Sequence, residues 1–544
     1  MYQALNPSIE IHNKVLYLKF DFDKDLVAVV GKQGLGMDWS RARRLWYARC
    51  TKIFVDKFLE VFPHFKPEFK EYVSTLPLPY LISSKYLMEH QRLAVLKALK
   101  VPRYCFFHDI GTGKTVLQID LIKQKRVKTL VVCPLSIIET VWMEDIDKFA
   151  GPVLNAVNLW KMRQKKNQLD QALQIYNLCI INFESFKVEA ERLAKAGFQM
   201  LLVDESAKLK NARSQTTKRI KEFAENMDYV YELSGCPAPN SEMEYFSQAQ
   251  IIDPTLFGSS FYAFRNKYFY SHGYGNFRWS MKEEMREEFM EKLKSISEVV
   301  RKEDVLDLPE RTYNIRKVYL NTVERKAYEE MKRHLVIEFG GREVIAANAG
   351  VKLMKLREGT SGFYLDDDGN VVQVGTSKLD ELKELLEEIG DHQVIIWIHF
   401  HHEGDMVQKM LDSRLPAYFQ IHGKHKPSQP LWGRVDGTIK NQNVKDEIVR
   451  QFKEGNIQYL IAHPLSLGHG VTLTNCSITV DFSLSHSYEQ FNQKAGRIYR
   501  KGQKNKCSYF FLIADCSVDE VIYQALKHKG KVVDAVFRYI RGGK

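Results

Sequence analysis

The chain has 544 residues, more than one ordinary hydrophobic core can organise, so we expect two or three domains. Its 44% hydrophobic and 27% charged residues are typical of a soluble globular protein, and no window is apolar enough to span a bilayer. The eight cysteines lack CxxC spacing, which argues against zinc modules and disulfide frameworks. Basic residues outnumber acidic ones by 79 to 67, an excess that fits a polyanionic partner and a solvated lysine-rich surface equally well. We therefore expect a cytoplasmic protein that does not contact membranes.

The first 75 residues are predicted to form a small α+β domain. The strand candidates "KVLYLKFDF" and "RLWYARCT" are followed by the helical pattern "KIFVDKFLEVFPHF", and the prolines of "LPLPY" (76–80) mark a joint. Basic residues here alternate with aromatic ones, a pattern that serves phosphate binding and base stacking or, equally, the core of an accessory domain. The residues concerned are Trp39, Arg41, Arg43, Arg44, Trp46, Tyr47 and Arg49.

Residues 76–254 are predicted to form an α/β lobe. Short apolar runs alternate there with amphipathic stretches such as "VLQIDLIKQKRV"; the runs are "YCFFHDI", "TLVVCPL", "NLCIINF", "MLLVDES" and "YVYELSG". Uninterrupted apolar runs of this kind are typical of strands buried on both faces of a parallel sheet. The alternation therefore indicates a doubly wound lobe.

The pattern changes in residues 255–345, which are charged, helical in period and poor in strand candidates. A second α/β series occupies residues 346–544, with strand candidates such as "HQVIIWIHF" and "CSYFFLIAD". The predicted fold class is α/β: two doubly wound parallel-sheet lobes with helical insertions between them, plus the small N-terminal domain. The basic segment 421–435 is predicted to be an inserted loop that either touches DNA or is a plain surface hairpin.

The octapeptide "HDIGTGKT" (108–115) follows an apolar run and precedes a helical pattern, which is the context of a phosphate-binding loop. Gly111 and Gly113 would let backbone N–H groups turn toward phosphate at a helix N-terminus. Lys114 would reach the β- and γ-phosphates, and the Thr115 hydroxyl would hold Mg²⁺. The first glycine of the P-loop pattern is replaced by His108, so a glycine turn with a surface lysine remains an alternative on this octapeptide alone.

An acidic pair and two arginines complete the candidate chemistry. Asp204 and Glu205 follow the apolar run "MLLV", where the first could hold Mg²⁺ and the second could polarise an attacking water. Arg497 and Arg500, in "QKAGRIYRKGQ", are three residues apart and would project from one face of a helix toward developing phosphate charge. A basic helix is more often a solvated face, and the spacing QxxGRxxR is what favours the phosphate role.

Together these segments resemble superfamily 2 helicases and translocases, specifically the Swi/Snf-like branch, over residues 80–515. The segments that carry the resemblance, in chain order, are "LMEHQRLAVLKAL", "HDIGTGKT", "VVCPLSIIETVWMEDIDKF", "INFES", "DESAKLKN", "LSGCPAPN", "VIIWIHFHH", "SLGHGVTLT" and "QKAGRIYRKGQ". Members of this branch have an acidic residue rather than glycine where His108 stands. Departures are Ser206 and Ala207 in the acidic box, Cys236 where threonine is usual, His469 between two glycines, and Thr472 where asparagine is common.

The resemblance implies two RecA-like lobes that bind ATP and Mg²⁺ and act on DNA mainly through backbone contacts. It implies ATP-binding residues Gln91, His108, Asp109, Ile110, Gly111, Thr112, Gly113, Lys114, Thr115 and Gly470. The implied catalytic residues are Lys114, Asp204, Glu205, Arg497 and Arg500, with Thr115 and Asp204 as the Mg²⁺ ligands. The implied DNA contacts are Pro134, Ser136, Asn182, Ser185, His399 and Thr474.

The sequence thus predicts a monomeric, DNA-stimulated ATPase that translocates on duplex or branched DNA in replication, recombination or repair. The small size and the "DESA" variant indicate a phage or bacterial member, and residues 1–75 faintly resemble the HARP-like domains of annealing helicases. One alternative is an RNA-stimulated helicase. Another is a non-catalytic nucleic-acid clamp with a degenerate ATPase.

Overall fold

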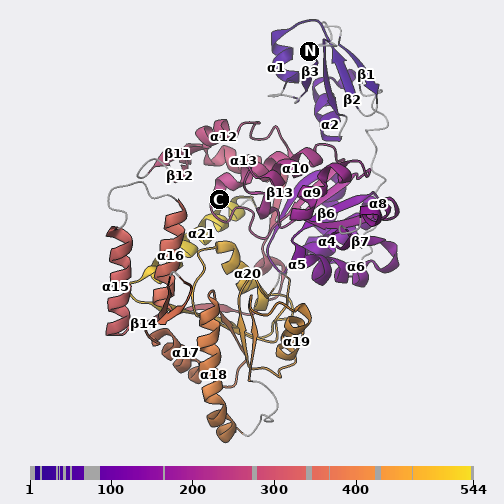
Figure 1. Cartoon of the computed structure of the whole chain (residues 1–544). Helices are drawn as coiled ribbons and strands as arrows, with labels where there is room; N and C mark the ends of the chain where they lie inside the picture. Colours follow the sequence, from indigo (N-terminus) through magenta and orange to yellow (C-terminus); the bar gives the residue numbers. More distant parts are fainter. Residues whose placement is uncertain are drawn as a thin grey trace. The chain divides into compact units, whose positions relative to one another are not determined.

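The computed structural model divides into two compact units, residues 1–305 with 533–544 and residues 306–532 (Figure 1). The residues it describes are 7–12, 15–31, 35, 37–40, 44–49, 52–65, 86–162, 166–272, 278–337, 346–366, 368–422, 431–467 and 470–540. Arg41, Arg43, His469, the proline joint at 76–80 and positions 423–430 of the predicted insertion lie outside them. Within these described ranges, no helix has both the length and the apolar character that crossing a membrane requires.

The N-terminal part is a four-stranded antiparallel sheet in the order β1-β2-β4-β3, with two helices. Its elements are β1 (Ser8–His12), β2 (Val15–Lys19), α1 (Lys24–Val30), β3 (Asp38–Ser40), β4 (Leu45–Arg49) and α2 (Lys52–Val61). Trp46 packs against the core that α2 builds with Phe58 and Phe62, and Trp39 lies on its ring at 5.3 Å. Tyr47 is 38% exposed and pairs with Tyr17 across the sheet, and Trp39 is 47% exposed. Because successive residues of a strand face opposite sides, Trp46 and Tyr47 lie on different faces of this sheet.

The first lobe contains a seven-stranded parallel sheet in the order β13-β5-β10-β9-β6-β8-β7. Its strands are β5 (Arg103–His108), β6 (Thr129–Cys133), β7 (Ala156–Asn158), β8 (Leu178–Asn182), β9 (Met200–Asp204), β10 (Tyr229–Leu233) and β13 (Ser297–Val300). Every residue of β5, β6, β8 and β9 is buried, which explains why these strands appear in the sequence as unbroken apolar runs. The helices around them include α3 (Glu89–Lys100), α4 (Lys114–Lys125), α9 (Phe183–Ala194), α10 (Gln215–Ala224) and α11 (Tyr245–Ile252).

A helical segment follows the strand β10 and returns to the same sheet. It comprises α12 (Phe261–Tyr268), the hairpin β11 (Phe269–His272) and β12 (Arg278–Met281), and α13 (Arg286–Ile296). Aromatic rings of Phe257, Phe264 and Phe289 pack together in it. The chain then enters β13, which pairs in parallel with β5.

The second lobe has a six-stranded parallel sheet in the order β14-β21-β20-β17-β19-β18. Its strands are β14 (Arg311–Val318), β17 (Val394–Trp397), β18 (Trp432–Val435), β19 (Tyr459–Ala462), β20 (Ile478–Asp481) and β21 (Cys507–Ala514). The helices include α15 (Thr322–Ile337), α16 (Ala346–Thr360), α17 (Ser377–Ile389), α18 (His401–His422), α19 (Gln442–Lys453), α20 (Tyr488–Ile498) and α21 (Val518–Ile540). Lys378 and Asp519 form a fully buried ion pair of 2.6 Å that ties α17 to α21.

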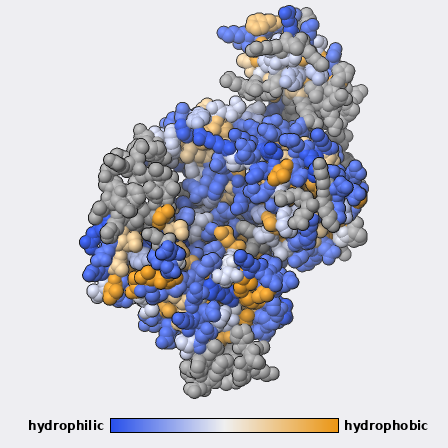
Figure 2. All heavy atoms as spheres, viewed as in Figure 1, coloured by the Kyte–Doolittle hydropathy of each residue, from blue (hydrophilic) through white to orange (hydrophobic). Residues whose placement is uncertain are grey.

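The predicted fold class is confirmed: two doubly wound parallel-sheet lobes with helical insertions accompany a small α+β domain. The strand β13 adds to the first sheet and β14 to the second, so the predicted insertion at 255–345 contributes one strand to each lobe. In Figure 2, the visible face of the described residues is largely hydrophilic, with apolar side chains in scattered groups.

Candidate nucleotide site and nucleic-acid interface

The loop 108–115 connects β5 to α4 and is shaped by two glycines. Gly111 and Gly113 have φ values of 92° and 77°, in the left-handed region that favours glycine. Lys114 begins α4, and its Nζ donates to the carbonyl oxygens of His108 at 2.9 Å and Asp109 at 3.3 Å. The loop therefore folds around its own lysine at a helix N-terminus, which is the geometry that binds phosphate.

Gln91, on α3, supports the backbone of this loop through hydrogen bonds. Its Nε2 donates to the carbonyl oxygens of Thr112 and Gly113, both at 3.0 Å, and its Oε1 accepts from the backbone N–H of Met88 at 2.8 Å. A Cβ added at Gly113 would collide with the same amide nitrogen. Gln91 is 2% exposed, so in this structure its amide supports the loop backbone.

The acidic pair lies at the carboxyl end of β9, the second strand from β5 in the same sheet. Asp204 is 4% exposed and accepts hydrogen bonds from Trp142 Nε1 and from the backbone N–H of Glu205, each at 3.0 Å. Burial raises the pKa of Asp204, while the charge of Lys114 and these hydrogen bonds act to lower it. Glu205 has a φ of 59°, a strained conformation for a residue other than glycine that is often found at functional sites.

His108 and Asp109 face the edge strand β13 and the residues that follow it. The His108 side chain is fully buried, and its Nε2 lies 2.9 Å from Oε1 of Glu298. Burial lowers the pKa of His108 despite this carboxylate. Asp109 Oδ2 accepts from the backbone N–H of Lys302 at 3.2 Å. These two side chains hold the loop against β13 and the residues after it. Only the backbone atoms of His108 and Asp109 are therefore left to face a nucleotide.

The donor set of this site fits a nucleotide with Mg²⁺. Thr115 supplies a hydroxyl oxygen in the first turn of α4 and Asp204 a carboxylate oxygen, and hard oxygen ligands of this kind, completed by water and phosphate, suit Mg²⁺. Among the described residues, no group of three or more His, Cys, Asp or Glu side chains is arranged to hold a metal by protein ligands alone. The residues therefore fit a cation that arrives with phosphate.

The second lobe brings together three of its predicted residues. Arg497 is 6% exposed on α20, and its Nη1 donates to the carbonyl of Val471 at 3.4 Å. Arg500 Nη1 donates to the carbonyl of Gly470 at 3.3 Å, and Gly470 has a left-handed φ of 84°. The carbonyl groups of Gly470 and Val471 thus each lie beside one of the two guanidinium groups.

The predicted DNA contacts differ in exposure. In the first lobe, Ser136 is exposed, whereas Pro134 and Asn182 are buried and Ser185 is fully buried. Asn182 ends β8, and its Oδ1 is buried without a hydrogen-bond partner. Thr474, in the second lobe, is half-buried.

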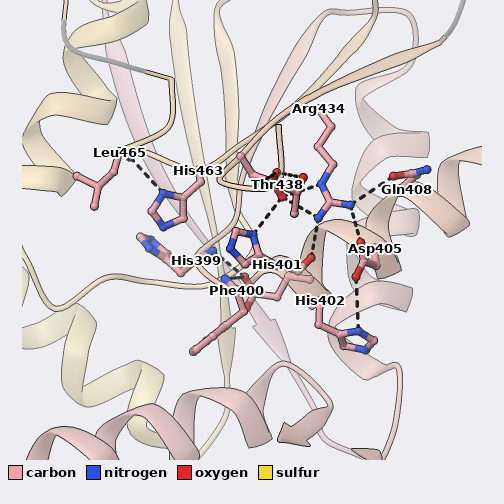
Figure 3. Close-up of polar contacts among 12 residues, drawn as sticks. His399, Phe400, His401, His402, Asp405, Gln408, Arg434, Thr438, His463 and Leu465 are labelled. Atoms are coloured by element: carbon pink, nitrogen blue, oxygen red, sulfur yellow. Dashed lines mark hydrogen bonds and ion pairs between the residues drawn. The ribbon is translucent and has the colours of Figure 1, made fainter. Parts of the chain in front are cut away.

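His399 follows β17, beside His463 at a ring distance of 5.7 Å (Figure 3). Its backbone N–H donates to Oε2 of Glu403 at 2.8 Å, while its ring Nε2 is buried without a hydrogen-bond partner. Burial, followed by the positive charges of Lys494 and Arg357, holds the pKa of His399 well below its ordinary value. The ring is therefore neutral at physiological pH.

Arg434 forms several hydrogen bonds at the carboxyl edge of the second sheet (Figure 3). Its guanidinium donates to Asp405 at 2.5 Å, to Asp436 at 2.7 Å and to the carbonyl of His401 at 2.9 Å, and it lies 3.4 Å from Oε1 of Gln408. These bonds tie the end of β18 to the first turns of α18. The Arg434 guanidinium therefore has a structural role at this edge of the sheet.

Trp142, Glu298 and Gly235 are parts of the site that sequence reasoning missed. Trp142 lies 62 residues before Asp204, Glu298 lies 190 residues after His108, and no local pattern pairs either couple. A Cβ at Gly235 would lie 2.8 Å from Cγ1 of Ile110 and 3.5 Å from Nζ of Lys114. The glycine of "LSGCPAPN" was visible in the sequence, but its closeness to the phosphate-binding loop was not.

A parallel sheet with a phosphate-binding loop after one strand and an acidic pair after another defines a P-loop nucleotide-binding protein with a helicase-type two-lobed fold. The SNF2-related domain model matches residues 90–365, and the helicase conserved C-terminal domain model matches residues 377–502. The chain belongs to the SNF2 family of helicase-like ATPases, which confirms the resemblance seen in the sequence.

Individual relatives are distant. Putative protein p41 of Acyrthosiphon pisum secondary endosymbiont phage 1 is 22% identical over 83% of this chain and 98% of its own length. Nuclear protein STH1/NPS1 of Saccharomyces cerevisiae is 24% identical over 78% of this chain, which spans only 33% of that protein. The solved Sulfolobus solfataricus SWI2/SNF2 ATPase core in complex with dsDNA covers 84% of this chain, and the match covers 94% of that structure, with 19% identity and a TM-score of 0.39.

Proposed function

We propose that this protein is a DNA-stimulated ATPase that translocates on duplex or branched DNA. The observation that carries the proposal is the loop 108–115, with Lys114 folded into it and Asp204 at the end of β9 in the same sheet. Membership of the SNF2 family supports ATP hydrolysis, and the helicase conserved C-terminal domain supports a nucleic-acid partner, which we propose to be DNA.

The residues of the first lobe take distinct roles in this proposal. Lys114 binds the β- and γ-phosphates, and Thr115 and Asp204 are the residues that would hold Mg²⁺, which neutralises phosphate charge when bound. Glu205 orients the attacking water and accepts its proton. The strained backbone of Glu205 fits this role. Strain at a single residue persists only where surrounding contacts hold it, and such residues cluster at functional sites.

The second lobe supplies cations in the proposal. The guanidinium groups of Arg497 and Arg500 stabilise the charge that develops on the transferred phosphoryl group, and Gly470 brings backbone close to them. The predicted DNA contacts Pro134, Ser136, Asn182, Ser185, His399 and Thr474 remain proposals, and the exposed Ser136 offers the most direct one. Contacts mainly to the phosphate backbone imply weak sequence preference and strong salt dependence.

We base the proposed biological setting on the ATPase chemistry of the site and on a relative encoded by a phage. A relative encoded by a phage matches nearly its whole length, which favours a compact motor acting at forks or junctions in replication, recombination or repair. We propose a cytoplasmic monomer. The N-terminal sheet exposes Trp39 on one face and Tyr47 on the other, and we propose that it recognises the DNA substrate through one of these aromatic side chains.

The test is ATP hydrolysis by the purified chain with single-stranded, duplex, forked and four-way-junction DNA, and with single- and double-stranded RNA. We expect duplex or branched DNA to raise the rate most. A rate that no DNA changes would refute the proposal, and stimulation by RNA alone would establish the RNA-dependent alternative. Absence of hydrolysis under every condition would establish the non-catalytic clamp. Strand displacement measured on the same DNA panel separates unwinding from translocation.

A further inference from the structure

Gln248, on α11, connects two loops of the nucleotide site although it belongs to neither. Its side chain is 1% exposed, and its Oε1 accepts a hydrogen bond from the Ser206 hydroxyl at 2.8 Å. Its Nε2 donates to the carbonyl oxygen of Pro237 at 2.7 Å and to that of Glu244 at 3.1 Å. One amide therefore holds the residue after Glu205 and the segment 234–240 at the same time.

The first connection fixes a strained backbone. Glu205 has a φ of 59°, which is costly for a residue with a side chain and persists only where neighbouring contacts hold it. Ser206 is the next residue, fully buried and bonded to Gln248. Ser247, on the same helix, donates its hydroxyl proton to the carbonyl of Leu209 at 2.6 Å, so α11 holds both ends of the turn 206–209.

The second connection controls how close segment 234–240 lies to the phosphate-binding loop. Gly235 packs so tightly that an added Cβ would lie 2.8 Å from Ile110 and 3.5 Å from Nζ of Lys114. Ser234 donates its backbone N–H to the carbonyl of Phe106 at 3.2 Å, which ties the start of the segment to β5. The Gln248–Pro237 bond ties its middle to α11.

Resting on the proposed ATPase function, we propose that Gln248 is a positioning residue for hydrolysis. In this proposal Gln248 fixes the positions of Glu205 and of segment 234–240 relative to Lys114. A shift of the turn at 205–209 would therefore move segment 234–240, and the reverse. Gln248 touches neither nucleotide nor DNA in this proposal and acts through Ser206 and Pro237. Loss of its two links displaces the water-orienting carboxylate by a fraction of an ångström to an ångström, a scale of misplacement that lowers rate steeply.

Gln250 provides a matched control on the same helix. It is 4% exposed, its Oε1 accepts from Lys221 Nζ at 2.5 Å, and its Nε2 donates to the carbonyl oxygens of Pro254 and Gly258. Its bonds resemble those of Gln248 in number and burial but reach a different part of the lobe. Gln250→Leu therefore reproduces the cost of losing a buried amide without touching either loop.

The test compares Gln248→Leu, Ser206→Ala, their double variant and Gln250→Leu at a temperature where thermal unfolding shows all to be folded. We expect Gln248→Leu and Ser206→Ala each to lower kcat for DNA-stimulated hydrolysis at least about tenfold, with KM for ATP within about threefold of the unmodified chain. The double variant should lose less than the two single effects added together, because the Ser206–Gln248 bond is already absent in each single variant. Gln250→Leu should stay within about twofold of the unmodified kcat. Equal kcat in Gln248→Leu and Gln250→Leu, or additive effects in the double variant, would overturn the proposal.

Hydrogen–deuterium exchange without nucleotide tests the same link independently of activity. Gln248→Leu should increase exchange in segments 205–209 and 234–240, and Gln250→Leu should leave both unchanged. Unchanged exchange in Gln248→Leu would refute the positioning role. If the unmodified chain hydrolyses no ATP, the proposed function fails, and the exchange result still decides whether Gln248 joins the two loops.

Discussion

The indole N–H of Trp142 donates a hydrogen bond to Oδ2 of Asp204 across 3.0 Å, while the backbone N–H of Glu205 donates to Oδ1 at the same distance. Trp142 is fully buried and Asp204 nearly so. Both carboxylate oxygens thus already have donors, which fix the plane of the carboxylate. An outer residue that orients a metal-binding carboxylate in this way commonly matters nearly as much as the ligand itself.

Trp142→Phe keeps most of the ring and removes only this donor. We expect the Mg²⁺ concentration needed for half-maximal ATP hydrolysis to rise roughly tenfold, because the Asp204 carboxylate becomes free to turn. A Mg²⁺ titration of the ATPase rate measures this. Trp160→Phe is the control, since Trp160 is 41% exposed. The same Mg²⁺ dependence in both variants would contradict the orienting role of Trp142.

Lys114→Ala removes the ammonium group that the loop 108–115 surrounds. We expect ATP hydrolysis to fall at least about a hundredfold, because phosphate charge is left uncompensated, while DNA affinity stays within about twofold. Turnover and DNA-binding titrations measure the two effects. Lys123→Ala, in the same helix with its Nζ on the Tyr86 hydroxyl at 2.8 Å, is the control. Normal hydrolysis by Lys114→Ala would show that the nucleotide site lies elsewhere.

Gln91→Ala separates support of the loop from recognition of the base. Because the Gln91 amide donates to the carbonyl oxygens of Thr112 and Gly113, we expect its loss to lower the free energy of unfolding by about 1–3 kcal/mol before any ATP is added. Urea unfolding without nucleotide measures this, and KM for ATP should rise in parallel. Unchanged stability with a raised KM would assign Gln91 to base recognition alone.

Glu232→Gln tests the buried carboxyl that lies beside Ser206 and Cys105. Burial raises the pKa of Glu232 well above its usual value, so the folded chain keeps this group protonated at pH values where the unfolded chain has released the proton. Stability contributed by the group is therefore present at acid pH and falls as pH rises above the unfolded pKa. Glutamine does not ionise, so Glu232→Gln should unfold at a higher temperature than the unmodified chain near pH 8 and at a similar one near pH 4.

Thermal unfolding followed across pH measures the Glu232 effect. Glu283→Gln is its control, because the Glu283 side chain is 80% exposed. We expect the control to follow the pH profile of the unmodified chain. A Glu232→Gln profile parallel to that of the unmodified chain would show that Glu232 ionises normally in the folded state.

The amino-acid sequence by itself determined the two-lobed α/β class and the family. Strands such as β5, β6, β8 and β9 are buried on both faces. Such strands require consecutive apolar residues, and each therefore appears in the sequence as an unbroken apolar run. The loop 108–115 was equally visible, because a left-handed turn requires glycine at Gly111 and Gly113, and a phosphate site requires a lysine at the helix start. Chemistry confined to a few consecutive residues leaves a local pattern.

Only the tertiary structure decided which distant side chains support those residues. Trp142 on Asp204, Glu298 on His108 and Gln248 on Ser206 are separated by 62, 190 and 42 residues, and the order of the strands together with the packing of helices on the sheet brings them together. It also decided burial, placing Ser136 in solvent and Ser185 in the core although both were predicted as DNA contacts. A hydrogen bond between strands or helices depends on how the sheet is ordered, and that order has no short-range pattern in the sequence.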